Sequence, residues 1–227
     1  MKEKVKKKND PVIKTKRLLI QPMTDEEIRE LCKKASSEDL RTAYKGMLSG
    51  CEEDPQNRIW YAPWKMSLKK EGTYIGDLGF KGPVREHAVE IGYGILKEYE
   101  GNGYMTEAAK ALMEWAFGME GVVFIEAETA PDNKASQRIL EKLGFVPDGE
   151  GEEGPRFVAE NPLTNWMSIY MLFGISIGTS FGMTFGNIGI GLSLGLCLGL
   201  CIGAGLDSSA KKEREKIRRQ REMKKKS

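Results

Sequence analysis

The feature that most constrains this sequence is a run of 46 residues, 161–206, without one charged side chain. All 33 acidic and 35 basic residues of the 227-residue chain lie outside it. Glycine recurs there at every fourth position, in two series: Gly174, Gly178, Gly182, Gly186 and Gly191, Gly195, Gly199, Gly203. Small residues at i and i+4 let two apolar helices touch backbone to backbone, whereas in water each such glycine costs a helix about 1 kcal/mol relative to alanine. The pattern excludes a uniformly soluble globule. It favours helices that lie in lipid, where the backbone must make its hydrogen bonds within the protein.

Two apolar pieces, 166–185 and 188–206, are each long enough to span one hydrocarbon core of about 30 Å, at about 1.5 Å per residue. Gly186-Asn187 supplies a turn between them. We therefore expect a transmembrane hairpin that contacts lipid through residues 166–206. Its glycine stripes would face each other or a second copy of the chain, which would make a homo-oligomer. The segment resembles glycine-zipper hairpins at the ends of other bacterial proteins. The alternative is a soluble glycine-rich tail packed on the rest of the chain.

Charge divides the remaining sequence into an acidic body and two basic ends. Residues 1–17 carry a net charge of +6, residues 18–163 carry −10, and residues 211–227 carry +7. Because basic flanks of membrane spans stay in the cytoplasm, the pattern predicts a body on the cytoplasmic side of the cell membrane, with a cytoplasmic protein as the alternative. The predicted domains are a basic arm (1–11), an acidic body (12–163), the apolar segment (164–206) and a basic tail (207–227).

Metal binding is not expected, because the chain has one histidine, His87, and four cysteines without a CxxC pair. We also expect no nucleic-acid partner.

Hydrophobic periodicity in the body predicts interleaved strands and helices, a mixed α/β class with a mixed sheet. The predicted strands are 15–21, 64–68, 73–81, 88–96 and 122–129, followed by short extended pieces at 145–146 and 156–159. The predicted helices are 24–35, 39–48, 103–117 and 133–143, with a polar loop at 50–57.

One local pattern points to an anion site. The strand Glu90–Leu96 runs into a glycine-containing loop, and the loop opens a helix near Gly103. Glycine allows close approach of the backbone, and the first N–H groups of a helix have no internal partner, so a pyrophosphate could bind there without basic side chains. Alone, the pattern is also typical of a tight turn before a packed helix.

A second pattern follows about 30 residues later: a strand, then Asn133-Lys134-Ala135-Ser136 opening a helix, then Gly144-Phe145. With TKRLLIQPMT at the start, EIGYGILKEYEGNGYMTEAAKAL, NKASQRILEKLGF and the closing GEEGPRF, residues 12–163 resemble the GNAT superfamily of acetyl-CoA-dependent N-acetyltransferases. Within it, they resemble the branch that acetylates the N-termini of ribosomal proteins.

The resemblance implies a set of residues that bind acetyl-CoA: Ile95, Leu96, Gly101, Asn102, Gly103, Tyr104, Met105, Thr106 and Asn133. Asn133 would bond the pantetheine arm, although asparagine is also an ordinary helix N-cap. Three positions depart from the family pattern. Glu100 replaces Gln or Arg, and we expect its side chain to point away from the diphosphate. Met105 replaces a small residue, and Leu140 stands where many members have a catalytic tyrosine.

Two residues are predicted to be catalytic. Glu90 would act as a general base through water, because an amine must lose a proton before it attacks; the alternative is a solvated strand end. By the same resemblance, Ser136 would protonate or stabilise the leaving thiolate; the alternative is an ordinary helix residue. His87 is expected at the surface.

The sequence thus predicts a membrane-tethered enzyme that transfers acetyl from acetyl-CoA to a primary amine, on a protein N-terminus or a small molecule, by direct attack. The alternative is a non-catalytic acyl-CoA-binding or scaffold protein that assembles through its glycine hairpin.

Overall fold

A computed structural model describes residues 10–225. The chain divides into two compact units, with the boundary between Asn161 and Pro162. The predicted basic arm, 1–11, lies outside the described residues except for Asp10 and Pro11.

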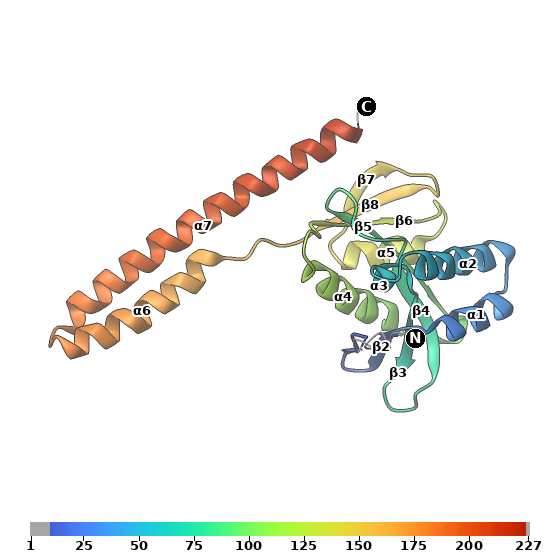
Figure 1. Cartoon of the computed structure of the whole chain (residues 1–227), viewed down its shortest axis with the longest axis horizontal. Coiled ribbons are helices and arrows are strands. Elements are labelled where there is room, and N and C mark those ends of the chain that lie inside the picture. Colours follow the sequence, from blue (N-terminus) through green and yellow to red (C-terminus); the bar gives the residue numbers. More distant parts are fainter. Residues whose placement is uncertain (1–9, 226–227) are drawn as a thin grey trace, which may run out of the picture. The chain divides into compact units, whose positions relative to one another are not determined.

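The first unit contains an eight-stranded sheet and five α-helices (Figure 1). The strands are β1 (Ile13–Lys14), β2 (Leu18–Pro22), β3 (Trp64–Leu68), β4 (Tyr74–Phe80), β5 (Ala88–Ile95), β6 (Phe124–Glu128), β7 (Val146–Glu150) and β8 (Pro155–Glu160). The α-helices are α1 (Asp25–Lys34), α2 (Glu38–Glu53), α3 (Arg58–Tyr61), α4 (Tyr104–Phe117) and α5 (Lys134–Lys142), with a short 3-10 turn, η1, at Lys97–Tyr99. This arrangement confirms the predicted mixed α/β class.

The sheet has the order β1-β2-β3-β4-β5-β6-β8-β7, and every neighbouring pair is antiparallel except β5–β6. That parallel pair is short, because its register covers only Ala88↔Phe124 to Glu90↔Glu126. Beyond Glu90, β5 continues to Ile95 without a partner on its β6 side. A gap in the middle of the sheet therefore begins directly after Glu90.

Different helices pack on the two faces of the sheet. On one face, α4 packs over the core, where Trp115 lies 4.8 Å from the ring of Trp64 and 6.3 Å from that of Phe80. On the other face, α1 and α2 are tied to β3 and β4, through Lys65 with Glu27 and through Tyr44 with Asp77. Side chains alternate along a strand, so each sheet residue belongs to one of these faces.

The predicted loop at 50–57 is partly wrong, because α2 continues through Gly50 to Glu53. Gly50 is inside the helix because the ring of Tyr61 lies against it: a Cβ there would be 2.3 Å from a ring carbon. The short helix α3, absent from the prediction, supplies that tyrosine. Tertiary packing thus explains a glycine that the local pattern indicates as a breaker.

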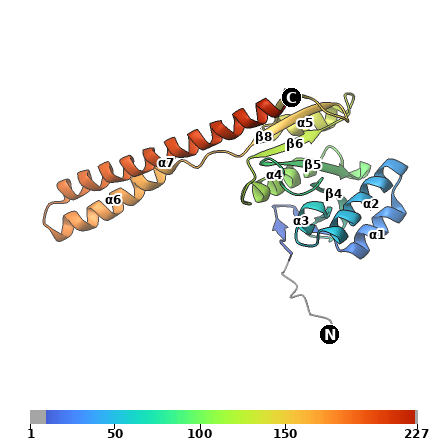
Figure 2. The same cartoon turned by 45° about the horizontal axis from the view of Figure 1, so that its top comes forward.

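The second unit is a helical hairpin of α6 (Trp166–Thr184) and α7 (Ile188–Lys225), which run side by side (Figure 2). The two glycine series face each other. A Cβ on Gly178 would lie 2.3 Å from the carbonyl oxygen of Gly191, and one on Gly195 would lie 2.1 Å from that of Gly174. Only glycine allows so close an approach of the two backbones.

The open end of the hairpin is closed by Asp207, whose carboxylate accepts hydrogen bonds from the backbone N–H groups of Trp166 (2.8 Å) and Met167 (3.2 Å). These N–H groups begin α6 and have no acceptor within that helix. An acid also complements the positive end of the helix dipole. Asp207 therefore fixes the position of α7 along α6.

The outer surface of the hairpin is apolar, with large side chains such as Leu172, Phe173, Phe181 and Leu198 each at least 60% exposed. By length and composition, α6 and the first part of α7 are apolar enough to cross a membrane. After Leu206, α7 continues as a charged helix to Lys225.

Candidate active site

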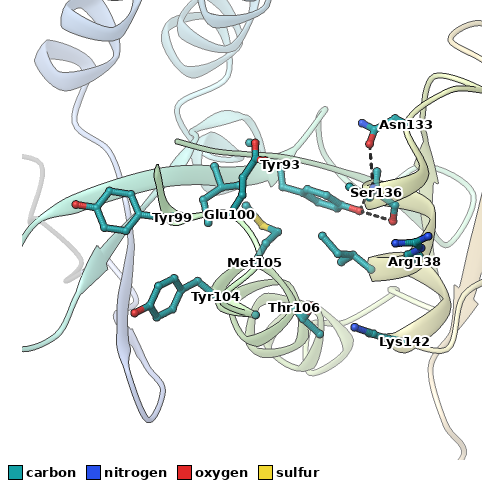
Figure 3. A pocket seen from close by; sticks show the side chains of 16 residues that line it. Tyr93, Tyr99, Glu100, Tyr104, Met105, Thr106, Asn133, Ser136, Arg138 and Lys142 are labelled. Carbon is teal, nitrogen blue, oxygen red and sulfur yellow. Dashed lines mark hydrogen bonds between the residues drawn. The ribbon is translucent and has the colours of Figure 1, made fainter. Parts of the chain in front are cut away.

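A cavity of about 420 Å³ opens beside the sheet gap, between the start of α4 and α5 (Figure 3). Its lining combines the end of β5, the glycine loop, the first turn of α4 and one side of α5: Tyr93, Gly94, Ile95, Tyr99, Glu100, Gly101, Gly103, Tyr104, Met105, Thr106, Asn133, Ala135, Ser136, Arg138, Ile139 and Lys142. Two segments that are separate in the sequence, 93–106 and 133–142, thus border one space.

The glycine loop has the backbone conformation that only glycine adopts readily. Gly101 and Gly103 both have φ of +73°, in the left-handed region. Gly103 is the N-cap of α4 and makes no side-chain capping hydrogen bond, and the first N–H groups of a helix have no partner within it. Tyr104, Met105 and Thr106 of this first turn line the cavity. The cavity therefore borders the loop that the sequence predicts to bind an anion.

Arg17 holds this loop in place. Its guanidinium donates to Glu107 in the first turn of α4 at 2.6 Å and to the carbonyl oxygen of Asn102 at 3.0 Å, and it stacks over the Tyr104 ring at 4.3 Å. Burial raises the pKa of Glu107, but hydrogen bonds from Thr15 and Arg17 outweigh it, so the pKa is lowered overall. Sequence reasoning did not single out Arg17, which was part of the predicted strand 15–21; in the structure it lies in the bend between β1 and β2.

On the opposite side of the cavity, Asn133 caps α5 by accepting a hydrogen bond from the Ser136 N–H at 3.0 Å. The Asn133 side-chain NH₂ has no partner among residues 10–225. The Ser136 hydroxyl lies 2.9 Å from the Tyr93 hydroxyl, which reaches across from β5 (Figure 3). Burial raises the pKa of Tyr93, although the bond to Ser136 opposes this, so the phenol stays protonated near neutral pH and can donate.

Two cations border the cavity from α5, Arg138 and Lys142, and neither makes an ion pair within the described part of the chain. They lie four residues apart, after Lys134, so they share one helix face. That periodic Lys-Arg-Lys pattern was the signal that could have identified them from the sequence.

Most, but not all, of the nine predicted cofactor-binding residues line the first cavity. Seven line the cavity: Ile95, Gly101, Gly103, Tyr104, Met105, Thr106 and Asn133. Leu96 and Asn102 do not. The N–H of Leu96 bonds the carbonyl of Ile75, and the side chain of Asn102 braces the loop by donating to the carbonyls of Tyr99 and Glu100.

The two predicted catalytic residues are not in one cavity. Ser136 lines the first cavity, but Glu90 does not. Tyr93 is three positions after Glu90 in the same strand, so their side chains point to opposite faces of the sheet. Glu90 instead borders a second cavity of about 700 Å³, whose lining includes six carboxylates and two cations: Glu90, Glu126, Glu128, Glu150, Glu152, Glu153, Lys81 and Arg156.

Glu90 is 28% exposed, and its Oε1 lies 2.6 Å from the Lys81 ammonium as an ion pair. This oxygen is buried and accepts no well-directed hydrogen bond within residues 10–225. Burial raises the pKa of the Glu90 carboxyl, and neighbouring Glu128 and Glu153 add to the rise, while Lys81 lowers it; the net direction is upward. Glu90 is therefore a half-buried carboxylate of increased basicity and not a freely solvated strand end.

His87 lies exposed in the turn before β5, with φ of +66°, and its Nδ1 is 3.2 Å from the carbonyl oxygen of Gly121. It lines neither cavity.

Comparison with protein families identifies the two parts of the chain. The model of the acetyltransferase (GNAT) domain matches residues 17–146, more than half of the chain, and a model described as a glycine zipper membrane protein matches residues 162–209. The chain belongs to the GNAT acetyltransferase family and carries a glycine-zipper segment after that domain.

Similar curated proteins include the uncharacterized N-acetyltransferases YjdG and YoaA of Bacillus subtilis (strain 168). YjdG is 37% identical over 91 residues, which cover 40% of this chain and 54% of YjdG. YoaA is 27% identical over 151 residues, 61% of this chain and 85% of YoaA. The [ribosomal protein uS5]-alanine N-acetyltransferase of Escherichia coli (strain K12) is 33% identical over 85 residues, 37% of this chain and 44% of that protein. The chain thus spans about half of the length of several relatives it matches.

Solved structures share the fold. The ribosomal-protein-S5-alanine acetyltransferase from Vibrio fischeri has a TM-score of 0.55 at 20% identity, covering 67% of this chain and 97% of that one. RimL, an L7/L12 α-N-protein acetyltransferase in complex with coenzyme A, has a TM-score of 0.52 at 15% identity, covering 66% of this chain and 98% of that one.

Proposed function

We propose that this protein transfers an acetyl group from acetyl-CoA to a primary amine by direct attack, and that its hairpin tethers it to a membrane. The observation that carries the proposal is the gap between β5 and β6, with the glycine-loop cavity on one face of the sheet and the Glu90 cavity on the other. Two reactants can approach the gap from opposite sides.

Acetyl-CoA would occupy the first cavity. The open N–H groups at the start of α4 would bind the diphosphate, as helix N-termini bind anions. Arg138 and Lys142 would add charge that the coenzyme's phosphates can pair with. The free NH₂ of Asn133 would donate to a carbonyl of the pantetheine arm.

Catalysis would use residues from both faces. Glu90 would take a proton from the ammonium group of the acceptor, through a water, so that the free amine attacks the thioester carbonyl. As the C–N bond forms and the C–S bond breaks, Ser136 would donate to the departing thiolate. Tyr93, which bonds Ser136, would supply the phenol that the family pattern places at the position of Leu140.

A protein N-terminus is the proposed acceptor. The second cavity is wide and lined mostly by carboxylates, which suits a cationic amine carried on a chain. The similarity of the chain to the [ribosomal protein uS5]-alanine N-acetyltransferase of Escherichia coli supports the same class of substrate.

Membrane attachment would come from α6 and the first part of α7. Their exposed apolar side chains and mutually packed glycines suit lipid contact, and the match to a glycine zipper membrane protein supports it. The basic end of α7 favours the cytoplasmic side, which also holds acetyl-CoA.

The test is turnover by the full chain in detergent or nanodiscs, with radiolabelled acetyl-CoA and a panel of peptides and small amines. Acetylation of peptides with a free N-terminus, and none of the same peptides with a blocked one, is expected. Binding of acetyl-CoA without turnover of any amine would instead support a non-catalytic acyl-CoA-binding protein.

A further inference from the structure

The surroundings of Glu90 contain one cation placed to control it. Lys81 follows β4, and its backbone N–H donates to the Glu90 carbonyl oxygen at 2.9 Å, which fixes the two residues side by side. Its ammonium lies 2.6 Å from Glu90 Oε1 and 2.7 Å from Glu153 Oε1. Lys81 thus joins the proposed base to the loop between β7 and β8.

That loop is held by close contacts of its own. The N–H of Glu153 donates to Glu128 Oε2 at 3.1 Å, and Gly151 lies so near Glu128 that a Cβ would be 1.9 Å from its Oε1. The N–H of Gly151 also donates to the carbonyl of Gly154 at 2.8 Å. The loop therefore presents Glu153 to Lys81 in a defined place.

We propose that Lys81 is a positioning residue for the acetyl transfer: it orients the Glu90 carboxylate and keeps it ionised, while Glu153 limits how strongly it does so. The inference rests on the proposed role of Glu90 as the base. An opposite charge close to a carboxylate stabilises its ionised form, and a like charge destabilises it. Lys81 shared between two carboxylates leaves Glu90 ionised yet basic enough to accept a proton.

Other charges face Glu90 as well, and they remain constant in the test. They come from the turn after β4, from β6, from the end of β7, from the loop after it and from β8: Arg85, Glu126, Glu128, Glu150, Glu152 and Arg156. Of the carboxylates in this set, Glu128 raises the Glu90 pKa, and Glu153 does the same from the loop. Among the described residues, Lys81 alone lowers the pKa of Glu90.

The experiment measures kcat/KM against pH for the full chain with a peptide acceptor, in the wild type and in Lys81→Met, Glu153→Gln and Lys81→Arg. Lys81→Met removes the cation that lowers the Glu90 pKa. The acidic limb of the pH profile of kcat/KM should therefore move to higher pH by about 1 unit, and kcat/KM should fall about tenfold at pH values below that limb. Glu153→Gln leaves Lys81 to Glu90 alone, so the limb should move to lower pH. Lys81→Arg should restore the wild-type position.

Opposite shifts of the two variants, with rescue by arginine, support the inference. A structural tether alone would weaken the protein in both variants without moving the limb in opposite directions, so an unmoved limb or two shifts of the same sign overturns it. Glu90→Gln is measured in parallel. If that variant keeps the wild-type rate and acidic limb, the base is wrongly assigned and the proposed mechanism fails with it; if it loses them while Lys81→Met does not change the limb, only the inference about Lys81 fails.

Discussion

The packing of the glycine hairpin leads to a sharp prediction, because two glycines of the same helix have opposite surroundings. A Cβ on Gly195 would lie 2.1 Å from the carbonyl oxygen of Gly174 and 2.8 Å from the Cα of Gly178, whereas a Cβ on Gly205 would meet nothing within 4 Å. Gly195→Leu should therefore push α6 and α7 apart, and Gly205→Leu should not.

The magnitude follows from those distances. Ordinary contact begins at about 3.4 Å, so the Cβ alone requires the backbones to separate by about 1.3 Å, and the rest of the leucine adds to this. A gap of 0.5–1 Å already removes about a quarter to a half of the attraction between facing atoms, and overpacking costs about 1–3 kcal/mol. Both variants gain a similar helix propensity, roughly 1 kcal/mol. The difference between them therefore isolates the packing cost.

The assay is a pulsed-EPR distance between nitroxides at Ser176→Cys and Ser193→Cys, two exposed positions on the facing helices, in a chain whose native cysteines are replaced. The distance should lengthen in Gly195→Leu and stay constant in Gly205→Leu, while both variants remain in the membrane fraction. Equal distances in the two variants would refute the packing argument. Loss of Gly195→Leu from the membrane would show that insertion itself depends on the glycine contact.

Three further predictions concern the site and the topology. Gly103→Val should abolish acetyl-CoA binding measured by calorimetry, while Gly72→Val, which introduces the same strain at φ of +71° in open space, should leave the affinity unchanged; equal affinities would remove the glycine-loop assignment. Glu90→Gln should lower kcat more at low pH than at high pH, because the free amine is scarcer at low pH. The variant and the wild type should become equally active only below the raised pKa of Glu90, where the wild-type carboxylate is itself protonated. Equal losses of kcat at every pH would indicate a positional role. In intact cells, a membrane-impermeant thiol reagent should label a single cysteine at Asn187 but not one at Ser209; labelling at Ser209 would mean a single crossing.

The sequence alone predicted those features whose conformation depends on residues close by in the chain. Gly103 before a helical period predicted the start of α4, since that N-cap needs a left-handed backbone. Asn133 predicted the start of α5, because its side chain caps the third residue after it. The glycine series predicted a hairpin, because a repeat of four residues puts all its members on one helix face.

Tertiary structure decided what lies across from each of these residues. The register of β5 against β6 ends at Glu90, so this carboxylate stands at the edge of the gap, on the face away from Ser136. Tyr93 comes from another element than Ser136, yet its hydroxyl lies 2.9 Å from the Ser136 hydroxyl. No spacing in the sequence relates Lys81 to Glu153, 72 residues later, because their meeting depends on how the β7–β8 loop folds back onto β6. Helix caps and stripes arise from contacts within a few residues, whereas the charge state of a base is determined by whichever groups the folded chain brings beside it.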